Sequence, residues 1–264
     1  MQRTIHPQEL ALQLMRAELE CTPVPPLSET YADLTPEVAY EIQNHWLSYK
    51  LAEGRQLVGR KIGLTSRAMQ QQMGVDQPDY GFLLDSMIVP SGSTLISSKF
   101  IQPRIEPEIA FWLIEDLHGP QITIKDVLAA TRGVSAALEL VDSRIINWRI
   151  KLVDTIADNA SSARVIVSAD IHPLDKLDLV TEDVELLQNG EPVGTGTGAA
   201  VLGHPAAAVA WLANKLAEFG VTLRAGQLVL PGAMCASVSV GPGDLFQAKF
   251  NRLGEVWVRF AESR

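Results

Sequence analysis

The sequence is short of the features that mark secreted or disulfide-stabilised proteins. Its 264 residues include two cysteines, Cys21 and Cys235, which lie far apart in the chain. A disulfide framework needs several cysteines, so we expect two free thiols, a usage typical of the reducing cytoplasm. The first residues, MQRTIHPQELALQLMRAE, carry charges where a signal peptide would need an unbroken apolar stretch. They therefore predict no secretion, and we expect a cytoplasmic protein.

Long apolar runs and an excess of basic residues are also missing. The longest apolar stretches, such as 206–213, are far shorter than the roughly 20 residues that a membrane-spanning helix needs. The formal net charge is −9, from 22 lysines and arginines against 31 aspartates and glutamates. Nucleic acids and anionic membranes bind basic surfaces, so this balance argues against both as partners. An acidic protein that handles an acidic substrate needs local cations, and a metal ion would supply one.

No nucleotide or histidine-metal motif is present. GTGTG at 194–198 lacks the strand, the spacing and the downstream acid of a dinucleotide fingerprint, and no P-loop Lys-Ser/Thr follows it. We expect a turn there. The five histidines show no metal-ligand spacing, and His204 before Pro205 predicts a helix start rather than a ligand.

The first part of the chain is predicted to be helical. Pro7 suits a first helical turn, and apolar residues then recur at helical spacing to residue 20. Thr35 and Pro36 form a cap and first turn, and a second apolar pattern runs from there to Gly54. The segment CTPVPPLSET between the two patterns is interpreted as a connector.

From residue 57 onward the chain changes to short apolar runs broken by Gly, Pro and Asp, which predict strands. Helices are expected after the Thr123–Asp126 cap and over 205–218, closed by Gly220. Strands with few intervening helices favour an α+β fold. We therefore predict a helical N-terminal segment over 1–55 and a strand-rich domain over 56–264, which contains the candidate catalytic residues discussed below. Strands are expected at 56–64, 105–114, 134–141, 165–168, 184–188 and 227–230, and an antiparallel pair at 245–250 and 255–260.

The sharpest chemical feature is IEPEI at 105–109. Side chains two residues apart on a strand share a face, so Glu106 and Glu108 are expected side by side. Like charges so placed repel unless they are neutralised, and a hard divalent cation such as Mg²⁺ or Mn²⁺ prefers carboxylate oxygens. On spacing alone, an exposed polar strand face with Pro107 at a sheet edge is an equal alternative.

A third carboxylate, Glu139, lies inside the apolar stretch ALELV, where an unpaired charge would be costly. It could instead be the solvent-facing residue of a strand. Together with Glu106 and Glu108 it would leave several positions open on a cation that accepts about six ligands. A 2-oxo acid could then chelate the cation through its carboxylate and 2-oxo group, which would polarise the ketone toward an enolate.

Six strings along the chain resemble those of a known family: VGRKIGLTS at 58–66, GVDQPDYGFLLD at 74–85, QPRIEPEIAF at 102–111, LELVDSRI at 138–145, DTIADNAS at 154–161 and GAAVLGHPAAAVAWLANKL at 198–216. They resemble the 2-oxopent-4-enoate (2-hydroxypenta-2,4-dienoate) hydratases and 4-oxalocrotonate decarboxylases of the fumarylacetoacetate-hydrolase superfamily. These are meta-cleavage enzymes of aromatic catabolism. The resemblance runs from about residue 8 to residue 260, and it implies a mixed β-sandwich or roll like the C-terminal domain of fumarylacetoacetate hydrolase, with flanking helices.

The resemblance also implies a set of site residues. Residue types alone would make Lys61 a surface lysine, Asp79 a turn former and Ser161 a strand cap. The family motifs imply instead that Lys61, Asp79 and Ser161 are catalytic. They further imply that Glu106, Glu108 and Glu139 bind Mg²⁺ or Mn²⁺, and that Thr65, Arg144 and Arg164 contact substrate.

The two activities of the family differ at the far end of the substrate. Asp79 favours a hydratase, because water addition needs an acid/base group and the decarboxylases have an apolar residue at the matching place. Arg164 in SSAR is more like the decarboxylases, where it could clamp a distal carboxylate. We predict a hydratase that converts 2-hydroxypenta-2,4-dienoate to 4-hydroxy-2-oxopentanoate; the alternative is a decarboxylase of 4-oxalocrotonate (2-oxohex-3-enedioate).

The resemblance finally bears on assembly. Family members form homo-oligomers, and homologous hydratases and decarboxylases form complexes with each other. A homo-oligomer is therefore expected, as is a complex with the partner enzyme of the pathway. A purely structural partner would have no use for the three carboxylates, the lysine and the acid, so that alternative is disfavoured, as is a plain binding protein for 2-oxo acids.

Overall fold

The computed structural model of the protein describes residues 4–66, 70–71, 75 and 77–262. Residues 1–3 of the N-terminal string, and Gly74 and Asp76 of the family string at 74–85, lie outside this range. The helices are α1 (Pro7–Glu20), α2 (Leu27–Thr30), α3 (Pro36–Ala52), α5 (Ile124–Ala129), α6 (Leu152–Ala157) and α7 (Pro205–Ala217). The strands are β1 (Leu57–Gly63), β2 (Asp79–Leu84), β3 (Ile88–Pro90), β4 (Thr94–Ile96), β5 (Arg104–Leu113), β6 (Thr131–Val141), β7 (Ser162–Val167), β8 (Asp183–Gln188), β9 (Glu191–Thr197), β10 (Leu228–Leu230), β11 (Val238–Ser239), β12 (Leu245–Phe250) and β13 (Glu255–Ala261).

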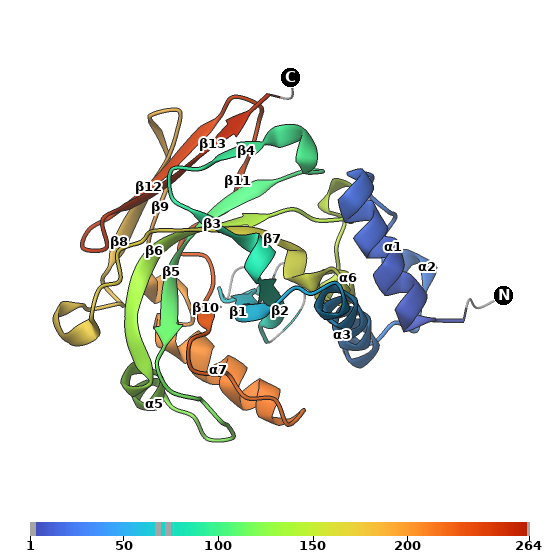
Figure 1. The fold of residues 1–264 in the computed structure, drawn as a ribbon, viewed down its shortest axis with the longest axis horizontal. Coiled ribbons are helices and arrows are strands. Elements are labelled where there is room, and N and C mark those ends of the chain that lie inside the picture. The colour runs from blue at the N-terminus through green and yellow to red at the C-terminus, as the bar shows by residue number, and fades with distance from the viewer. Residues whose placement is uncertain (1–3, 67–69, 72–74, 76, 263–264) are drawn as a thin grey trace.

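The strands form two mixed sheets, which confirms the predicted α+β fold (Figure 1). The larger sheet has the order β2-β1-β10-β5-β6-β7-β3, with β11 also paired to β5; the smaller has the order β4-β13-β12-β8-β9. Helices α1 and α3 lie at one flank of the larger sheet, and α7 lies below it in this view. No helix in the described ranges is long and apolar enough to span a bilayer.

The helix ends follow the predicted capping chemistry. The Thr35 hydroxyl accepts a hydrogen bond from the Val38 N–H at the start of α3, and Thr123 and Asp126 form a reciprocal capping box on α5. His204 accepts from the Ala206 N–H and begins α7, so its predicted role is confirmed. The predicted antiparallel pair near the C-terminus is β12 and β13.

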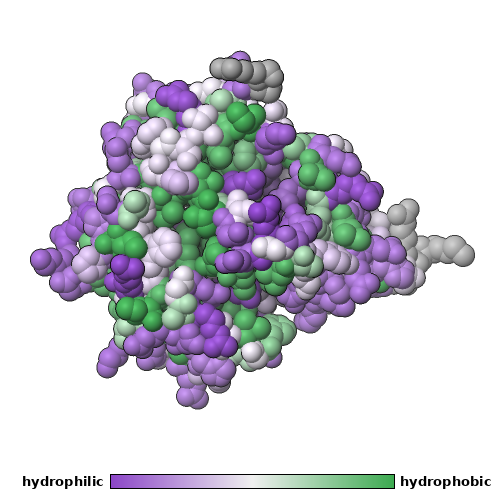
Figure 2. Space-filling model, in the orientation of Figure 1, coloured by the Kyte–Doolittle hydropathy of each residue, from purple (hydrophilic) through white to green (hydrophobic). Residues whose placement is uncertain are grey.

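Helices and sheets share one hydrophobic core. It includes Leu14 of α1, Trp46 of α3, Phe82 of β2, Phe111 of β5 and Phe246 of β12. The predicted division between residues 55 and 56 stays a prediction. Residues from both sides of it contribute to the same core. Figure 2 shows a band of apolar surface down the middle of one face, with hydrophilic side chains around it.

Two local predictions were wrong. The expected turn at GTGTG is not found: residues 194–197 lie in strand β9, and Gly198 begins a short 3-10 helix. Gly196 of β9 allows close packing against other backbone, because a Cβ there would lie 1.9 Å from the Met234 carbonyl oxygen. Pro107 does not mark a sheet edge: it lies in β5, between β6 on one side and the gap between β10 and β11 on the other. The proline-rich connector does join α1 and α3, and it contains the short helix α2.

Candidate active site

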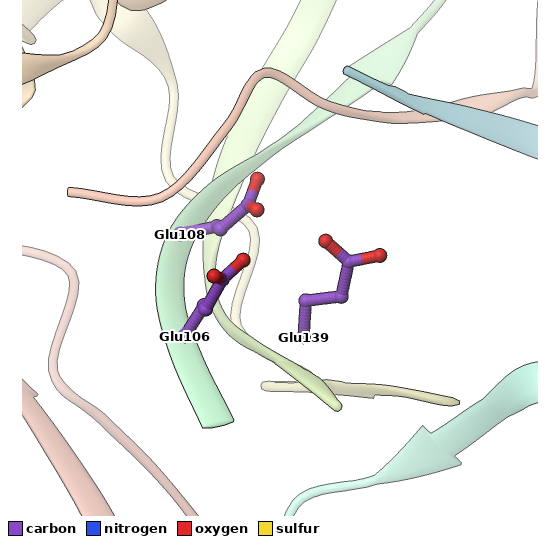
Figure 3. Close-up of side chains that lie close together, drawn as sticks. All are labelled: Glu106, Glu108 and Glu139. Carbon is purple, nitrogen blue, oxygen red and sulfur yellow. The ribbon is translucent and has the colours of Figure 1, made fainter. Parts of the chain in front are cut away.

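Three carboxylates converge on one face of the larger sheet. Glu106 of β5 lies directly opposite Glu139 of β6, and Glu108 follows two residues along β5, so all three side chains point to the same side (Figure 3). One oxygen atom of each lies within 4.8 Å of the others. Glu108 and Glu139 are fully buried and Glu106 is half-buried, so the exposed-face alternatives are wrong.

The cluster concentrates negative charge without enough hydrogen bonds to offset it. Burial and the neighbouring Glu139 raise the pKa of Glu106 to about 7, and the same two causes raise the pKa of Glu108 well above its ordinary value. The Gly232 N–H donates to Glu108 Oε2 at 2.8 Å. Glu108 Oε1 and both oxygens of Glu139 have no hydrogen-bond partner among the described residues. Such buried carboxylate oxygens fit a hard divalent cation.

Lys61 supplies a positive charge beside this cluster. It lies on β1, is 4% exposed, and places its Nζ atom 3.3 Å from Glu139 Oε2 and 3.0 Å from the Ala160 carbonyl oxygen. Burial alone would lower the pKa of Lys61, but Glu139 and Asp79 outweigh it and raise the pKa above its ordinary value. Lys61 is therefore a buried, charged ammonium and not a surface lysine.

Asp79 lies next to Lys61 at the start of β2, where its backbone pairs with Gly63. Its Oδ2 atom accepts a hydrogen bond from the Thr155 hydroxyl at 3.1 Å, whereas Oδ1 has no hydrogen-bond partner among the described residues. A Cβ at Gly63 would lie 2.2 Å from Asp79 Oδ1 and 3.4 Å from Lys61 Nζ, so both groups approach the same glycine. Burial raises the pKa of Asp79 although Lys61 lowers it. The site thus holds a buried carboxyl group with one oxygen that makes no hydrogen bond to the described residues.

Ser161 and Thr65 also lie near these groups. Ser161 follows Ala160, whose carbonyl oxygen holds Lys61, and its hydroxyl lies 3.3 Å from Asp158 Oδ2. Thr65 lies against Gly232, where a Cβ would be 2.0 Å from the Thr65 hydroxyl oxygen. Gly232 has φ +123° and could not carry a side chain here without strain and a clash. Thr65 therefore packs on the segment that donates to Glu108.

The guanidinium of Arg144 makes its hydrogen bonds within the protein. It is 1% exposed, its Nε atom donates to Asp158 Oδ1 at 2.5 Å, and its terminal nitrogens donate to the carbonyl oxygens of Asp142, Ser162 and Asp158. Its guanidinium stacks over the Trp46 ring, 4.9 Å from the centroid. These contacts make Arg144 part of the support of the site, and the predicted contact with substrate finds no support in them.

Arg164 lies on the wrong side of the sheet for the clamp that the sequence predicted. Val165 is opposite Glu139 in the β6–β7 pairing, and Arg164 is opposite Leu140. Neighbouring residues on a strand point to opposite faces, so Arg164 points away from the carboxylates. Its guanidinium lies 5.7 Å from the Phe100 ring, and Phe100 contacts Phe260 of the smaller sheet.

Several supporting residues were missed from the sequence. Thr155, Asp158 and Asn159 belong to the family string DTIADNAS, but no role was predicted for them. Gln43 gave no signal, since a single polar residue on a helix is usually exposed. It is 1% exposed, and its amide donates to the carbonyl oxygens of Tyr80 and Ile156.

Comparison with known proteins identifies the family of this chain. Residues 58–261 match the family described as fumarylacetoacetate (FAA) hydrolase C-terminal. The chain is 45% identical to a 2-keto-4-pentenoate hydratase of Paraburkholderia xenovorans, covering 97% of this chain and 96% of that one. It is 44% identical to a 4-oxalocrotonate decarboxylase of Pseudomonas sp. strain CF600, covering 95% of each.

A solved structure shows that the similarity includes the fold. The 4-oxalocrotonate decarboxylase from Pseudomonas putida G7, in complex with magnesium and adipate, superposes with a TM-score of 0.95 at 41% identity, covering 98% of this chain and 99% of that one. With the family match over most of its length, the chain belongs to the fumarylacetoacetate hydrolase family.

Proposed function

We propose that the protein is a divalent-metal-dependent lyase that adds water to 2-hydroxypenta-2,4-dienoate and forms 4-hydroxy-2-oxopentanoate in the meta-cleavage pathway of aromatic catabolism. One observation carries this proposal. A buried carboxyl group with one free oxygen, Asp79, and a buried ammonium, Lys61, lie beside three converging carboxylates. Water addition needs an acid/base group next to an electron sink. Asp79 and Lys61 are the candidate acid/base groups, and a cation held by the three carboxylates would be the electron sink.

Glu106, Glu108 and Glu139 are the proposed metal ligands, because their carboxylates converge and Glu108 and Glu139 have buried oxygens without hydrogen-bond partners, which suits Mg²⁺ or Mn²⁺. When bound, the ion would supply positive charge at the 2-oxo group of a chelating 2-oxo acid. A related decarboxylase has been solved with magnesium and adipate, a dicarboxylic acid.

The chain's own residues would manage the protons. The reaction moves the proton of the 2-hydroxyl group to C5, then adds a water oxygen to C4 and a proton to C3, so that one water is consumed for each substrate. We propose Asp79 and Lys61 as the acid/base groups of these transfers, with the Thr155 hydroxyl holding the second oxygen of Asp79. Ser161 and Thr65 are proposed to contact the water or the substrate.

A 4-oxalocrotonate decarboxylase is the second candidate, and the TM-score of 0.95 to such an enzyme favours it. The identity to hydratases and decarboxylases is nearly equal, at 45% and 44%, and does not separate them. The arginine that was expected to bind the extra carboxylate, Arg164, faces away from the cluster. The segment MCASVSVGPGD at 234–244 is also similar to the decarboxylases. Because the placement of Arg164 does not support the proposed arginine clamp, we retain the hydratase.

The decisive experiment offers the purified protein 2-hydroxypenta-2,4-dienoate and 2-oxohex-3-enedioate separately, with Mg²⁺. Loss of the ultraviolet absorbance of the first substrate without CO₂ release from the second is the expected result. Release of CO₂ from the second substrate, with the first left unhydrated, would identify a decarboxylase. Inactivity toward both would contradict the proposal as a whole.

Assembly and location complete the proposal. We propose a homo-oligomer, because apolar side chains such as Leu19 (84% exposed) and Phe219 (55% exposed) lie on the surface of a single chain. We also propose a complex with the partner enzyme of the pathway. Free Cys21 and Cys235 fit a cytoplasmic location. We also keep the division into residues 1–55 and a catalytic domain over 56–264 as a proposal.

A further inference from the structure

Next to Lys61, three consecutive residues adopt a backbone conformation that side chains disfavour. Asn159, Ala160 and Ser161 have φ values of +54°, +49° and +55°. Residues other than glycine visit this left-handed region as single residues, at a cost each time, and persist there only when the surroundings impose it. None of the three is a glycine, so the protein maintains a costly conformation at this point of the site.

The side chain of Asn159 binds this segment to strand β2. Its Oδ1 atom accepts from the Phe82 N–H at 2.8 Å, and its Nδ2 atom donates to the Phe82 carbonyl oxygen at 3.1 Å. The contact is close because the residue before Phe82 is a glycine: a Cβ at Gly81 would lie 2.6 Å from the Asn159 carbonyl oxygen. Asn159 is 2% exposed, so water does not compete for these bonds.

The same segment aims a carbonyl oxygen at Lys61. The Ala160 carbonyl accepts from Lys61 Nζ at 3.0 Å, while Glu139 lies 3.3 Å from Nζ. Gly81, the residue that packs against Asn159, is also the β2 partner of Lys61 in the sheet. A shift of the 159–161 segment would therefore move the carbonyl group that fixes the ammonium relative to Glu139 and Asp79.

We propose that Asn159 is a positioning residue: by binding both backbone groups of Phe82, it holds residues 159–161 in the left-handed conformation and directs the Ala160 carbonyl at Lys61. This inference rests on the proposed role of Lys61 in proton transfer. Asn159 does not contact the carboxylate cluster in the described structure, so it should affect proton transfer and leave metal binding unchanged.

The test compares Asn159→Ala with a matched control, Asn214→Ala. Asn214 on α7 makes the same pair of bonds, to the N–H and carbonyl of Ile122 at 2.8 and 2.9 Å, away from the site. Three quantities are measured: the Tm, the Mn²⁺ affinity by titration calorimetry, and the exchange of C3 protons of 2-oxopentanoate in D₂O by NMR. This saturated 2-oxo acid reports proton transfer without water addition.

Both variants should lower the Tm, because each loses two hydrogen bonds. Asn159→Ala alone should slow C3 exchange, by about 10- to 100-fold, as expected for a misplaced catalytic group. Its kcat should fall, with KM and Mn²⁺ affinity little changed. Asn159→Gly removes the amide but tolerates a positive φ, so it should be more stable than Asn159→Ala and still exchange slowly.

Two results would overturn the inference: exchange at the wild-type rate in a folded Asn159 variant, or a loss of Mn²⁺ affinity in proportion to the loss of exchange. Failure of both Asn159 variants to fold would also contradict it, since Asn159 would then serve the fold as a whole. Absence of C3 exchange in the wild-type protein would instead refute the proposed function.

Discussion

Gly63→Ala is the most direct test of how Asp79 is placed. The new Cβ would lie 2.2 Å from Asp79 Oδ1, whereas such contacts essentially never fall below 3.0 Å, so the carboxylate must move by about 0.8 Å. Movement of that size would disturb the 3.1 Å hydrogen bond from Thr155 and change the position of Oδ1 relative to Lys61. A displacement near 1 Å in a catalytic group costs about 100-fold in rate, and this is the loss of hydratase activity that we expect.

The same substitution should have a modest effect on stability. Overpacking a buried site costs about 1–3 kcal/mol, which for a protein of this size lowers the Tm by roughly 2–12 °C. Mn²⁺ affinity should be retained, because the three glutamates come from other strands. The matched control is Gly241→Ala, where the nearest atom to the new Cβ is 3.3 Å away. Wild-type turnover by a folded Gly63→Ala protein would refute the placement of Asp79 in the reaction.

Three further predictions concern the metal, the two polar side chains and the assembly. EDTA should abolish turnover and Mg²⁺ or Mn²⁺ should restore it, and Glu108→Gln should weaken Mn²⁺ binding in calorimetry without unfolding the chain; full activity in a rigorously metal-free preparation would contradict the metal site. Asp79→Asn should reduce hydration by about 100-fold or more while Mn²⁺ still binds, whereas Arg164→Ala on the opposite face should change kcat/KM little; the reverse ranking in steady-state assays would favour a decarboxylase. Light scattering at micromolar concentration should give a mass above the 28.8 kDa of one chain, and a monomer would exclude a stable oligomer.

Local patterns predicted the parts of the fold that local chemistry determines. Thr35, Thr123 and His204 begin helices where expected, since a cap is decided within one turn. The face shared by Glu106 and Glu108 followed from the two-residue repeat of a strand. The strand at 194–197 was missed because its glycines are needed for contacts that are distant in sequence: Gly194 lies against Cys235 and Gly196 against the Met234 carbonyl oxygen.

The register between strands could not be predicted from the sequence, and it decides which way Arg164 faces. Whether Arg164 faces Glu139 depends on the pairing of β6 with β7, which has an irregularity between Leu140 and Val141. Arg144 has the residue type of an anion-binding group, but Asp158 and three carbonyl oxygens occupy its guanidinium. Left-handed backbone at Ala160 likewise has no sequence signal, because alanine gives no hint of a positive φ.

The hydrogen bonds of Gln43 bear on the order in which the protein loses catalysis and metal binding on heating. Its amide joins the carbonyl oxygens of Tyr80 and Ile156, the residues directly after Asp79 and Thr155. The acid and the hydroxyl that orients it are therefore held together from helix α3, outside the matched family region of 58–261. The glutamates lie on the central strands β5 and β6, which are hydrogen-bonded to neighbouring strands. Fraying of α3 would separate Asp79 from Thr155 while the carboxylate cluster remains intact, so catalysis should be lost at a lower temperature than the ability to bind metal.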